Sequence, residues 1–404
     1  MAVSVGQVEQ LIEKVAPRSW AEDWDNSGLL VGSSAQRVNK ILLSLDVTME
    51  VIDEAVQEKA DLIVAHHPLM FKPLKNLRMD NQGAILPLAL YRNGISFYAA
   101  HTNLDQSGLS SSLTFGRLLG LQKTEYLEVT ASEKLYKIVT FVPEENVEAV
   151  RLALAAEGVG SGITDGEHSD NYAECFYQTK GQGMFRALNG AEPTIGNIGE
   201  LTRITEIKLE SIVEEKALSR AVKALHKAHP YEEPAYDLIP LRNTGKPRGY
   251  GIVGYLPAPM SLEELLQKFF GILESNSPCT CGGGCGEDCL NGSKIFPEIY
   301  DLSTIRTAGD FNKIIKKIAI ANGSGGSFVQ KAVFKGADLF ITGDLDYHTV
   351  LDALQAGTAV CEMGHFLSEI PMIQSLYAYL RKDKTMDDVQ MVISSSNKVP
   401  WGKR

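Results

Sequence analysis

Short, continuously apolar runs alternate with helical patterns along the first hundred residues. KILLSLDV (40–47), DLIVA (61–65) and ISFYAAH (95–101) lack the in–out alternation of a strand with one solvated face. MEVIDEAVQEKA (49–60), between the first two, spaces its apolar residues as a helix does. Apolar strands separated by helices are typical of a parallel sheet covered on both faces. We therefore predict an α/β fold here.

The same order returns near the C-terminus. KKIAIA (316–321), ADLFIT (337–342) and TAVCEM (358–363) read as strands, with helical patterns in GSFVQKAVFKG and TVLDALQAG between them. KADLIVAHH (59–67) and GADLFITGD (336–344) also share the Ala-Asp-Leu register. We predict a duplicated αβ unit that forms one layered domain. Chance resemblance between two generic βαβ units is the alternative, because such units share composition.

The middle of the chain has a different pattern. Strand and helix signals between residues 134 and 242 follow the order βαββαβ, which is the ferredoxin-like arrangement. Polar or Gly/Pro-bearing segments at Glu125–Lys134 and Arg242–Arg248 flank this region. We predict an α+β domain at 134–242, inserted into a metal-binding αβ domain whose halves are 1–128 and 248–404.

Composition excludes several classes of protein. The chain has 404 residues, of which 44% are hydrophobic and 22% charged, and a net charge of −11. An acidic chain is a poor general binder of nucleic acid or of anionic membranes. No apolar run approaches the length that spans a bilayer, and the N-terminus lacks the pattern of a signal peptide. Four of the six cysteines fall between 279 and 289, which favours a reducing cytoplasm over a disulfide framework.

Groups that bind metals or protons gather just after the predicted strands. Ligand sites of open parallel sheets lie at the carboxyl ends of the strands. Five of the eight histidines occur at such ends, together with several carboxylates. The residues are His66, His67, His101, Asp105, Asp344, Asp346, His348, His365 and Glu369.

This set is too large for one tetrahedral zinc ion with an open position. Two or three imidazoles and two carboxylates suit two divalent ions that share a bridging carboxylate. If a helix starts after Gly364, the spacing of His365 and Glu369 places both side chains on one face, one turn apart. Mixed N/O ligation fits zinc, iron, manganese, nickel or cobalt. The alternative is that these Asp and His residues only cap helices.

Several motifs occur in an order that resembles one family. They are WDNSGLLVG (24–32), AHHPLMF (65–71), HTNLD (101–105), NGSGGS (322–327), GADLFITGDLDYH (336–348) and GHFLSE (364–369). Together they resemble the GTP cyclohydrolase 1 type 2 homologs, which are Nif-three-like dinuclear metal-centre hexameric proteins. The resemblance covers 1–128 and about 248–404. Longer members carry a PII-like or CutA-like insert, which agrees with the βαββαβ segment and with HPYEEPAYD (229–237).

The resemblance implies a site and an assembly. The implied metal ligands are His66, His67, Asp105, His365 and Glu369, with the paired histidines on different ions and Glu369 touching both. It also implies a hexamer with metal centres facing an internal cavity, and a cytoplasmic location. It implies no settled activity.

Two stretches depart from the family pattern. After HTNLD the family continues Gly-Val-Asn-Asp, whereas this chain has Ser110 and Ser111 there, which can replace a helix-start device. A Cys/Gly-rich loop at 277–292 places four thiols in a C-x-C-x₃-C-x₃-C spacing. Its residues Cys279, Cys281, Cys285 and Cys289 form either a second site for a soft metal ion or an insertion with idle thiols.

The remaining candidates concern the substrate. His101, Asp344 and His348 are expected to transfer protons or to support a ligand from behind. Asn26 in WDNSG forms either a turn or a hydrogen bond to substrate. Ser324 lies in NGSGGS, whose backbone N–H groups are placed to receive an anion.

Two functions follow from this reading. The first is a metal-dependent hydrolase that acts on a nucleotide-like or other small phosphate, purine or pterin compound. The second is a metallochaperone or metal-storage protein, in which the four thiols pass ions to the dinuclear site.

Overall fold

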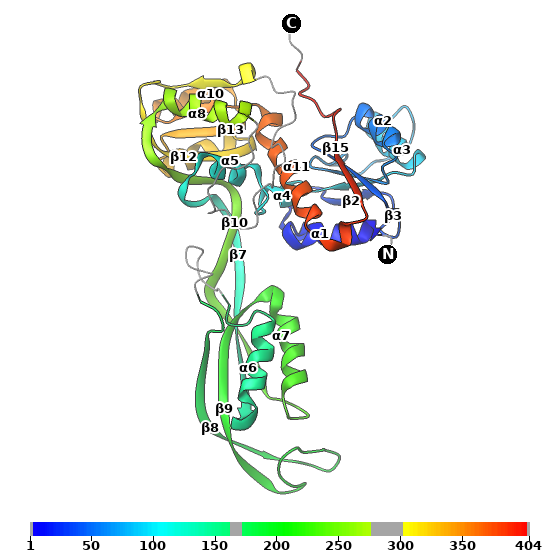
Figure 1. Ribbon diagram of the computed structural model, residues 1–404, viewed down its shortest axis with the longest axis vertical. Coiled ribbons are helices and arrows are strands. Elements are labelled where there is room, and N and C mark those ends of the chain that lie inside the picture. Colours follow the sequence, from blue (N-terminus) through cyan, green and yellow to red (C-terminus); the bar gives the residue numbers. More distant parts are fainter. Residues whose placement is uncertain (1–2, 162–171, 276–301, 402–404) are drawn as a thin grey trace. The chain divides into compact units, whose positions relative to one another are not determined.

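The computed structural model describes residues 3–161, 172–275 and 302–401 (Figure 1). The chain divides into two compact units, Met1–Glu128 with Gly249–Arg404, and Val129–Arg248. We call them the first and second unit. The predicted loop at 277–292, with Cys279, Cys281, Cys285 and Cys289, lies outside the described residues.

The first unit contains a five-stranded sheet in the order β15-β4-β5-β6-β2. These strands span Gln390–Ile393, Lys40–Ser44, Leu62–Ala65, Ser96–Ala99 and Gly28–Val31. The four strands β15, β4, β5 and β6 are parallel, whereas β2 runs antiparallel to β6. A short antiparallel pair, β1 (Val3–Ser4) with β3 (Arg37–Val38), lies outside this sheet.

A second sheet of the first unit has the order β11-β14-β13-β12-β10. These strands span Arg306–Ala308, Ala359–Glu362, Leu339–Asp344, Ile314–Ser324 and Tyr236–Ser261. Only β12, β13 and β14 are mutually parallel, and β10 and β11 run antiparallel to their neighbours. The prediction of one layered domain with a parallel sheet is therefore too simple, because the first unit has two mixed sheets. The antiparallel strand β11 has only three residues, so it carries little periodic signal.

The repeated Ala-Asp-Leu has the same structural role in both sheets. One carboxylate oxygen of Asp61 accepts hydrogen bonds from the backbone N–H groups of Asn39 and Lys40, at 2.7 and 3.1 Å. The carboxylate of Asp338 accepts in the same way from Lys316 and Lys317, at 2.9 and 3.0 Å. Each aspartate therefore fixes the start of the neighbouring parallel strand, which explains why both copies keep it.

Helices cover both faces of each sheet. On the five-stranded sheet, α1 (Val5–Val15) and α11 (His365–Arg381) pack on one face, and α2 (Met49–Gln57) and α3 (Gln82–Arg92) on the other. On the second sheet, α5 (Ser111–Leu119), α8 (Leu262–Ser275) and α11 oppose α9 (Val329–Phe334) and α10 (Tyr347–Gln355). Burial of both faces explains the continuous apolar strands of the sequence.

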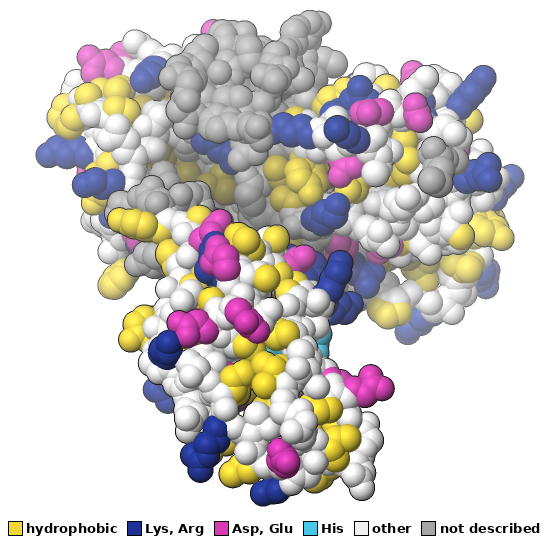
Figure 2. Space-filling view, turned by 60° about the horizontal axis from the view of Figure 1, so that its bottom comes forward, with side chains coloured by type: hydrophobic (Ala, Val, Ile, Leu, Met, Phe, Trp, Pro, Cys, Tyr) yellow, Lys and Arg dark blue, Asp and Glu magenta, His cyan; other side chains and the backbone are white. Residues whose placement is uncertain are grey.

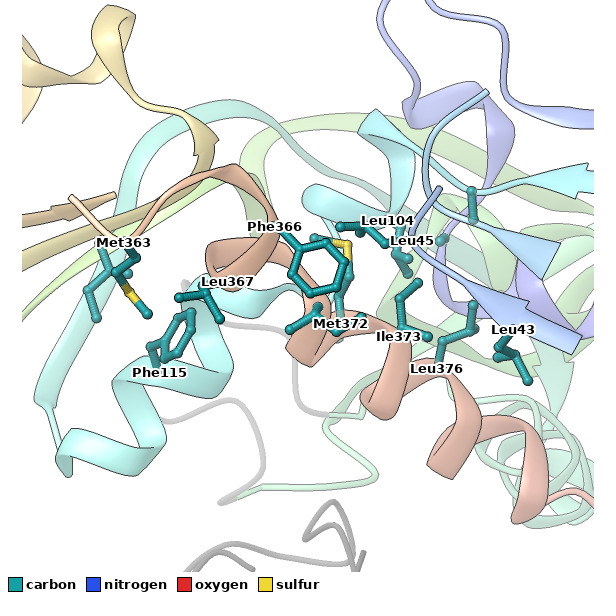
Figure 3. Close-up of a cluster of buried hydrophobic side chains, with 14 of the residues drawn as sticks. Leu43, Leu45, Leu104, Phe115, Met363, Phe366, Leu367, Met372, Ile373 and Leu376 are labelled. Carbon is teal, nitrogen blue, oxygen red and sulfur yellow. The ribbon is translucent and has the colours of Figure 1, made fainter. Parts of the chain in front are cut away.

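Helix α11 connects the two sheets of the first unit through one core. Its side chains pack with those of β4, β12 and β13 in a single hydrophobic cluster. Figure 3 shows Leu367 beside Phe115 of α5, and Ile373 and Leu376 beside Leu43 of β4. A helix that is apolar around most of its circumference is a buried helix. The first residue of α11 is thereby placed between the carboxyl ends of both sheets.

Ser111 of α5 stabilises α11 where its hydrogen-bond ladder is interrupted. Pro371 lies inside α11 and has no N–H to donate. The hydroxyl of Ser111 donates to the Glu369 carbonyl at 2.8 Å and accepts from the Met372 N–H at 3.1 Å. Ser110 is the N-cap of α5 and accepts from the Leu113 N–H. The serines that replace the family pattern therefore start one helix and hold another.

The second unit consists of most of β7 (Gln122–Pro143), α6 (Val147–Ala156), β8 (Phe176–Arg186), β9 (Leu201–Glu214), α7 (Glu215–Ala228) and the first part of β10. Its strands have the order β10-β7-β9-β8, and α6 and α7 pack with apolar residues of β7 and β9. The flanking segments Glu125–Lys134 and Arg242–Arg248 belong to regular strands. They lie within β7 and β10, because two polar strands that pair with each other satisfy their backbone groups without an apolar pattern.

The described part of the chain contains no helix that is both long and apolar enough to cross a membrane. The face in Figure 2 intersperses Lys and Arg side chains with Asp and Glu and with apolar patches. No large area of one charge sign is seen on that face.

We expect Ser111→Ala to lower the free energy of unfolding of the first unit by about 1–3 kcal/mol, because the Met372 N–H loses a buried acceptor. Thermal and denaturant unfolding measure this loss. Ser327→Ala, which changes an exposed serine of the same unit, is the control and should leave stability unchanged. Equal stability of both variants would contradict the role of Ser111.

Candidate metal centre

Both sheets of the first unit contribute candidate ligands at their strand ends. His66 and His67 directly follow β5. His101 is the N-cap of α4 (Thr102–Asp105), the short helix after β6, and Asp105 ends that helix. His365 is the first residue of α11, three residues after the end of β14. Folding therefore gathers residues that are about 300 positions apart in sequence.

The adjacent histidines are held by different partners. His66 is fully buried, and its Nδ1 lies 2.8 Å from the carbonyl oxygen of Ala100. His67 is partly exposed, and its Nδ1 lies 2.7 Å from Oδ1 of Asp46. The two rings are inclined by 51° with centroids 4.9 Å apart. The pair therefore presents two Nε2 atoms in different directions, as separate ions would require.

We call His66, His67, His101, Asp105, His365 and Glu369 the cluster. Its four histidines are oriented in the same manner. Nδ1 of His101 lies 2.8 Å from Asp25, and Nδ1 of His365 lies 2.8 Å from Asp344. A carboxylate or a carbonyl oxygen only accepts hydrogen bonds, so each Nδ1 must carry the proton. A neutral imidazole then has its free electron pair on Nε2, which is the atom that binds metals in such arrangements.

Glu369 is fixed by the start of α11. Gly364 has a φ of 77°, which favours glycine, and this turn leads the chain into the helix. The His365 N–H then donates to Asp344 Oδ1 at 3.1 Å. Glu369 follows one turn later and is buried. Its carboxylate lies so close to Gly323 that a Cβ there would be 2.3 Å from Oε1.

The cluster divides into two sets that share Glu369. Oε2 of Glu369 lies 3.1 Å from Nε2 of His67 and 3.1 Å from Nε2 of His365. Oε1 lies 3.8 Å from Nε2 of His66, which is 3.7 Å from Oδ1 of Asp105. Ligand atoms within each set lie within 4.8 Å of one another, as do those of His66, His67 and His101. One carboxylate thus faces two potential cation positions.

The cluster is unfavourable without positive charge. Nε2 of His66 and Oε2 of Glu369 are buried and have no hydrogen-bond partner among the described residues. Neutral imidazoles would point lone pairs at the carboxylate oxygens, so acceptors would face acceptors. An uncompensated buried carboxylate is costly. Divalent cations between these atoms would satisfy both, so the residues fit a metal site.

The pKa values of His67, His365 and Glu369 also indicate that the cluster favours positive charge. Burial opposes a charge on His67, but its contacts with Asp46 and Glu369 raise its pKa to about 10. Contact with Glu369 raises the pKa of His365 to about 9. Burial opposes a charge on Glu369 as well, but the imidazoles lower the pKa of its carboxyl group well below the usual range. Protons on two imidazoles can therefore take the place of cations, and metal binding would release them.

Asp105 is oriented by a residue near the end of β12. Nδ2 of Asn322 donates to Oδ1 of Asp105 at 2.7 Å, and the Ser112 hydroxyl donates to Oδ1 of Asn322 at 2.7 Å. Burial and the nearby charge of Glu369 raise the pKa of Asp105 to about 7. Asn322 is the first residue of NGSGGS, the segment expected to receive an anion. Its role in the structure is to position Asp105.

The other predicted residues have varied positions. His101 lies among the potential ligands, whereas Asp344 orients His365 from its Nδ1 side. His348 is exposed in the first turn of α10 with its ring against Tyr347. It belongs to none of the groups of potential metal ligands described above. Asn26 donates to the Met70 carbonyl at 2.6 Å, which links two loops. Ser324 is exposed at the end of β12.

Sequence reasoning missed two of the acids behind the histidines, Asp25 and Asp46. Asp25 accepts from His101, from Ser27 and from both the N–H and the hydroxyl of Thr102. Asp46 holds His67. Asp46 follows the strand end of β4, so the strand-end rule could have found it. Asp25 lies in WDNSG, where the turn pattern concealed it.

Comparison with known proteins identifies the family. Residues 3–284 and 292–400 match the family model Duf34/NIF3 (NGG1p interacting factor 3). The chain belongs to the Duf34/NIF3 family. The stretch between the matched ranges, 285–291, contains Cys285 and Cys289.

Relatives in this family extend over the whole chain. A protein of Halalkalibacterium halodurans named GTP cyclohydrolase 1 type 2 homolog is 37% identical over 405 residues, 99% of both chains. A Bacillus subtilis protein of that name is 34% identical, covering 92% of this chain and 91% of its own. The crystal structure of a Bacillus cereus protein related to NIF3 has a TM-score of 0.82 at 31% identity, covering 100% of both chains.

We expect Gly323→Ala to reduce metal binding, because the new Cβ would collide with Glu369 Oε1. Element analysis of the purified protein measures the metal content. Gly336→Ala is a matched control, since Gly336 has a φ of +71°, close to the +67° of Gly323, but nothing within 4 Å of its Cβ position. It should lose stability through backbone strain alone and keep its metal. Equal metal content in both variants would contradict the assigned position of Glu369.

Proposed function

We propose that this protein binds two divalent metal ions and acts as a metal-dependent hydrolase. The observation that carries the proposal is the position of Glu369, whose two carboxylate oxygens face different sets of ligands. His66 and Asp105 would hold one ion with Glu369, and His67 and His365 the other. Zinc, iron, manganese, nickel and cobalt all suit mixed nitrogen and oxygen ligands.

The residues around the cluster would keep these ligands oriented. Asp46 and Asp344 hold His67 and His365 through Nδ1, so that neither ring can turn its Nε2 away. Such outer hydrogen bonds also raise the basicity of an imidazole ligand. The Ser111 and Ser368 hydroxyls fix the backbone around Glu369, through Met372 and Gly323 respectively.

His101 has a separate place in the proposed reaction. One ring nitrogen of His101 lies within 4.8 Å of ring nitrogens of His66 and His67, and Asp25 holds its Nδ1. When bound, two divalent ions activate water near neutral pH and polarise the bond to be broken. His101 would then bind substrate or hold a proton beside them, because the other histidines already have Glu369 as a partner.

A nucleotide-like or other small phosphate, purine or pterin compound is the substrate we propose. The support comes from relatives at 34–37% identity whose name is GTP cyclohydrolase 1 type 2 homolog. Dinuclear sites are common in enzymes that hydrolyse phosphate compounds.

We propose that the second unit is a ferredoxin-like domain of the PII-like or CutA-like type. Its chain order and its strand order β10-β7-β9-β8 support this. We further propose a homohexamer in the cytoplasm, on the basis of the family resemblance. The molar mass in solution tests the assembly.

We expect Glu369→Gln to remove metal from both positions and to abolish hydrolysis of GTP. The amide keeps the shape of the side chain but loses the charge that both sets share. Element analysis gives the metal content, and chromatography of the products distinguishes phosphate loss from ring opening. The elution volume should stay that of the wild type, since the fold is held by other residues.

Glu263→Gln is the control, because this glutamate is exposed in α8, and it should behave as the wild type. Metal and turnover that survive in Glu369→Gln would contradict the proposal. Metal loss in this variant, with a metal-loaded wild type that hydrolyses nothing, would replace the hydrolase by a metallochaperone or metal-storage protein.

A further inference from the structure

Two large aromatic side chains lie exposed beside the candidate metal centre. Trp24 is 62% exposed and Phe71 is 52% exposed. Their ring centroids are 6.3 Å apart, with an angle of 35° between the planes. Single exposed apolar residues are ordinary on a protein surface. A neighbouring pair of exposed aromatic rings at the edge of a buried polar site is unusual, because it leaves ring faces in water.

The segments that carry the two rings are fixed. Asn26 donates to the carbonyl of Met70 at 2.6 Å, which joins the Trp24 segment to the Phe71 segment. Asp25 accepts hydrogen bonds from His101 and Thr102. A binding surface that is ordered before the ligand arrives loses less entropy on binding. The network around Asp25 thus orders the backbone next to Trp24 as well as the ring of His101.

The aromatic pair is adjacent to the metal ligands. The ring of His101 lies 5.9 Å from Trp24 and 5.7 Å from Phe71, and it meets both at steep angles of 78° and 68°. The ring of His66 lies 5.0 Å from that of His101. His101 is therefore a neighbour both of the aromatic pair and of a candidate metal ligand.

A hollow with positive charge adjoins Phe71. It has a volume of about 490 Å³, and Phe71, Lys72 and Lys75 are among its lining residues. Both lysines are exposed. Aromatic faces bind planar bases by stacking, and lysine side chains attract phosphate. The two features side by side are complementary to one class of molecule.

We propose that Trp24 and Phe71 form a subsite for the planar heteroaromatic ring of a nucleotide, with its phosphate directed to Lys72 and Lys75. This inference rests on the proposed function and deepens it, because it names the substrate class and its orientation. The ring edge would face His101 and the metal centre. Trp24 and Phe71 are substrate-binding residues in this proposal, and Asp25 and Asn26 are positioning residues.

Equilibrium dialysis of the full chain, loaded with Zn²⁺, against three probes tests the proposal. GMP carries ring and phosphate, guanosine only the ring, and ribose 5-phosphate only the phosphate. GMP should bind most tightly. Trp24→Ala and Phe71→Ala should each weaken GMP and guanosine by about 5- to 150-fold, the range of base–aromatic stacking, and leave ribose 5-phosphate unchanged. Trp24→Phe should retain most of the affinity.

Lysine variants and matched controls complete the experiment. Lys72→Ala with Lys75→Ala should weaken GMP and ribose 5-phosphate but not guanosine. Trp401→Ala and Phe334→Ala change exposed aromatic residues, 85% and 90% exposed, and should change nothing.

Several outcomes would overturn the subsite. They are equal binding of GMP and ribose 5-phosphate by the wild type, an equal loss in Trp401→Ala, or a Trp24→Ala variant whose only change is its oligomeric state. The last result would show that another copy of the chain covers these rings.

Binding does not require turnover, so the subsite and the hydrolase activity can be rejected separately. Ring-dependent binding without metal-dependent hydrolysis would retain the subsite and reject the hydrolase, and the reverse would reject only the subsite.

Discussion

The structure depends on one electrostatic constraint, the concentration of acceptor atoms around Glu369. Two imidazole Nε2 atoms lie 3.1 Å from one of its oxygens, and a third lies 3.8 Å from the other. Hydrogen bonds at Nδ1 prevent these rings from turning a donor toward the carboxylate while they are neutral. Positive charge must therefore enter the cluster, as protons or as metal ions. The raised pKa values of His67 and His365 express this demand.

The scaffold of the first unit serves to keep this cluster together. Helix α11 packs in a core shared by both sheets, so its first turn lies where their strand ends meet. Pro371 interrupts the helix two residues after Glu369, and Ser111 of α5 hydrogen-bonds the Glu369 carbonyl and the Met372 N–H on either side of it. Gly323 lets the end of β12 approach the carboxylate. The apolar core thus sets the position of the helix, and small polar residues set the position of the ligand.

The sequence predicts the elements of regular pattern and fails where pattern is absent. Strands with both faces buried have continuous apolar runs that the sequence reveals, namely β4, β5, β6, β12, β13 and β14. The carboxyl ends of these strands locate the candidate ligands. The antiparallel strand β11 of the second sheet was missed, since its three residues are too few for periodicity. Glu125–Lys134 and Arg242–Arg248 also lack an apolar pattern, although they lie within β7 and β10. Asp25 and Asp46 act through hydrogen bonds to histidines distant in sequence, which no local pattern records.

The two copies of Ala-Asp-Leu illustrate the limit of such reasoning. Their shared aspartates have the same structural task, whereas the residues after the strands have diverged. His67 follows β5 as a candidate ligand, and Asp344 at the end of β13 orients a ligand from α11. A repeat in sequence therefore indicated a repeated scaffold, and the site arises from what differs between the copies.

Anomalous scattering from a crystal grown with Zn²⁺, measured at the zinc edge, would locate the proposed ions. We expect two strong peaks within the cluster, one between His66, Asp105 and Glu369 and one between His67, His365 and Glu369. A map with no peak beside Glu369, or with zinc bound only by the cysteines at 279–289, would contradict this expectation.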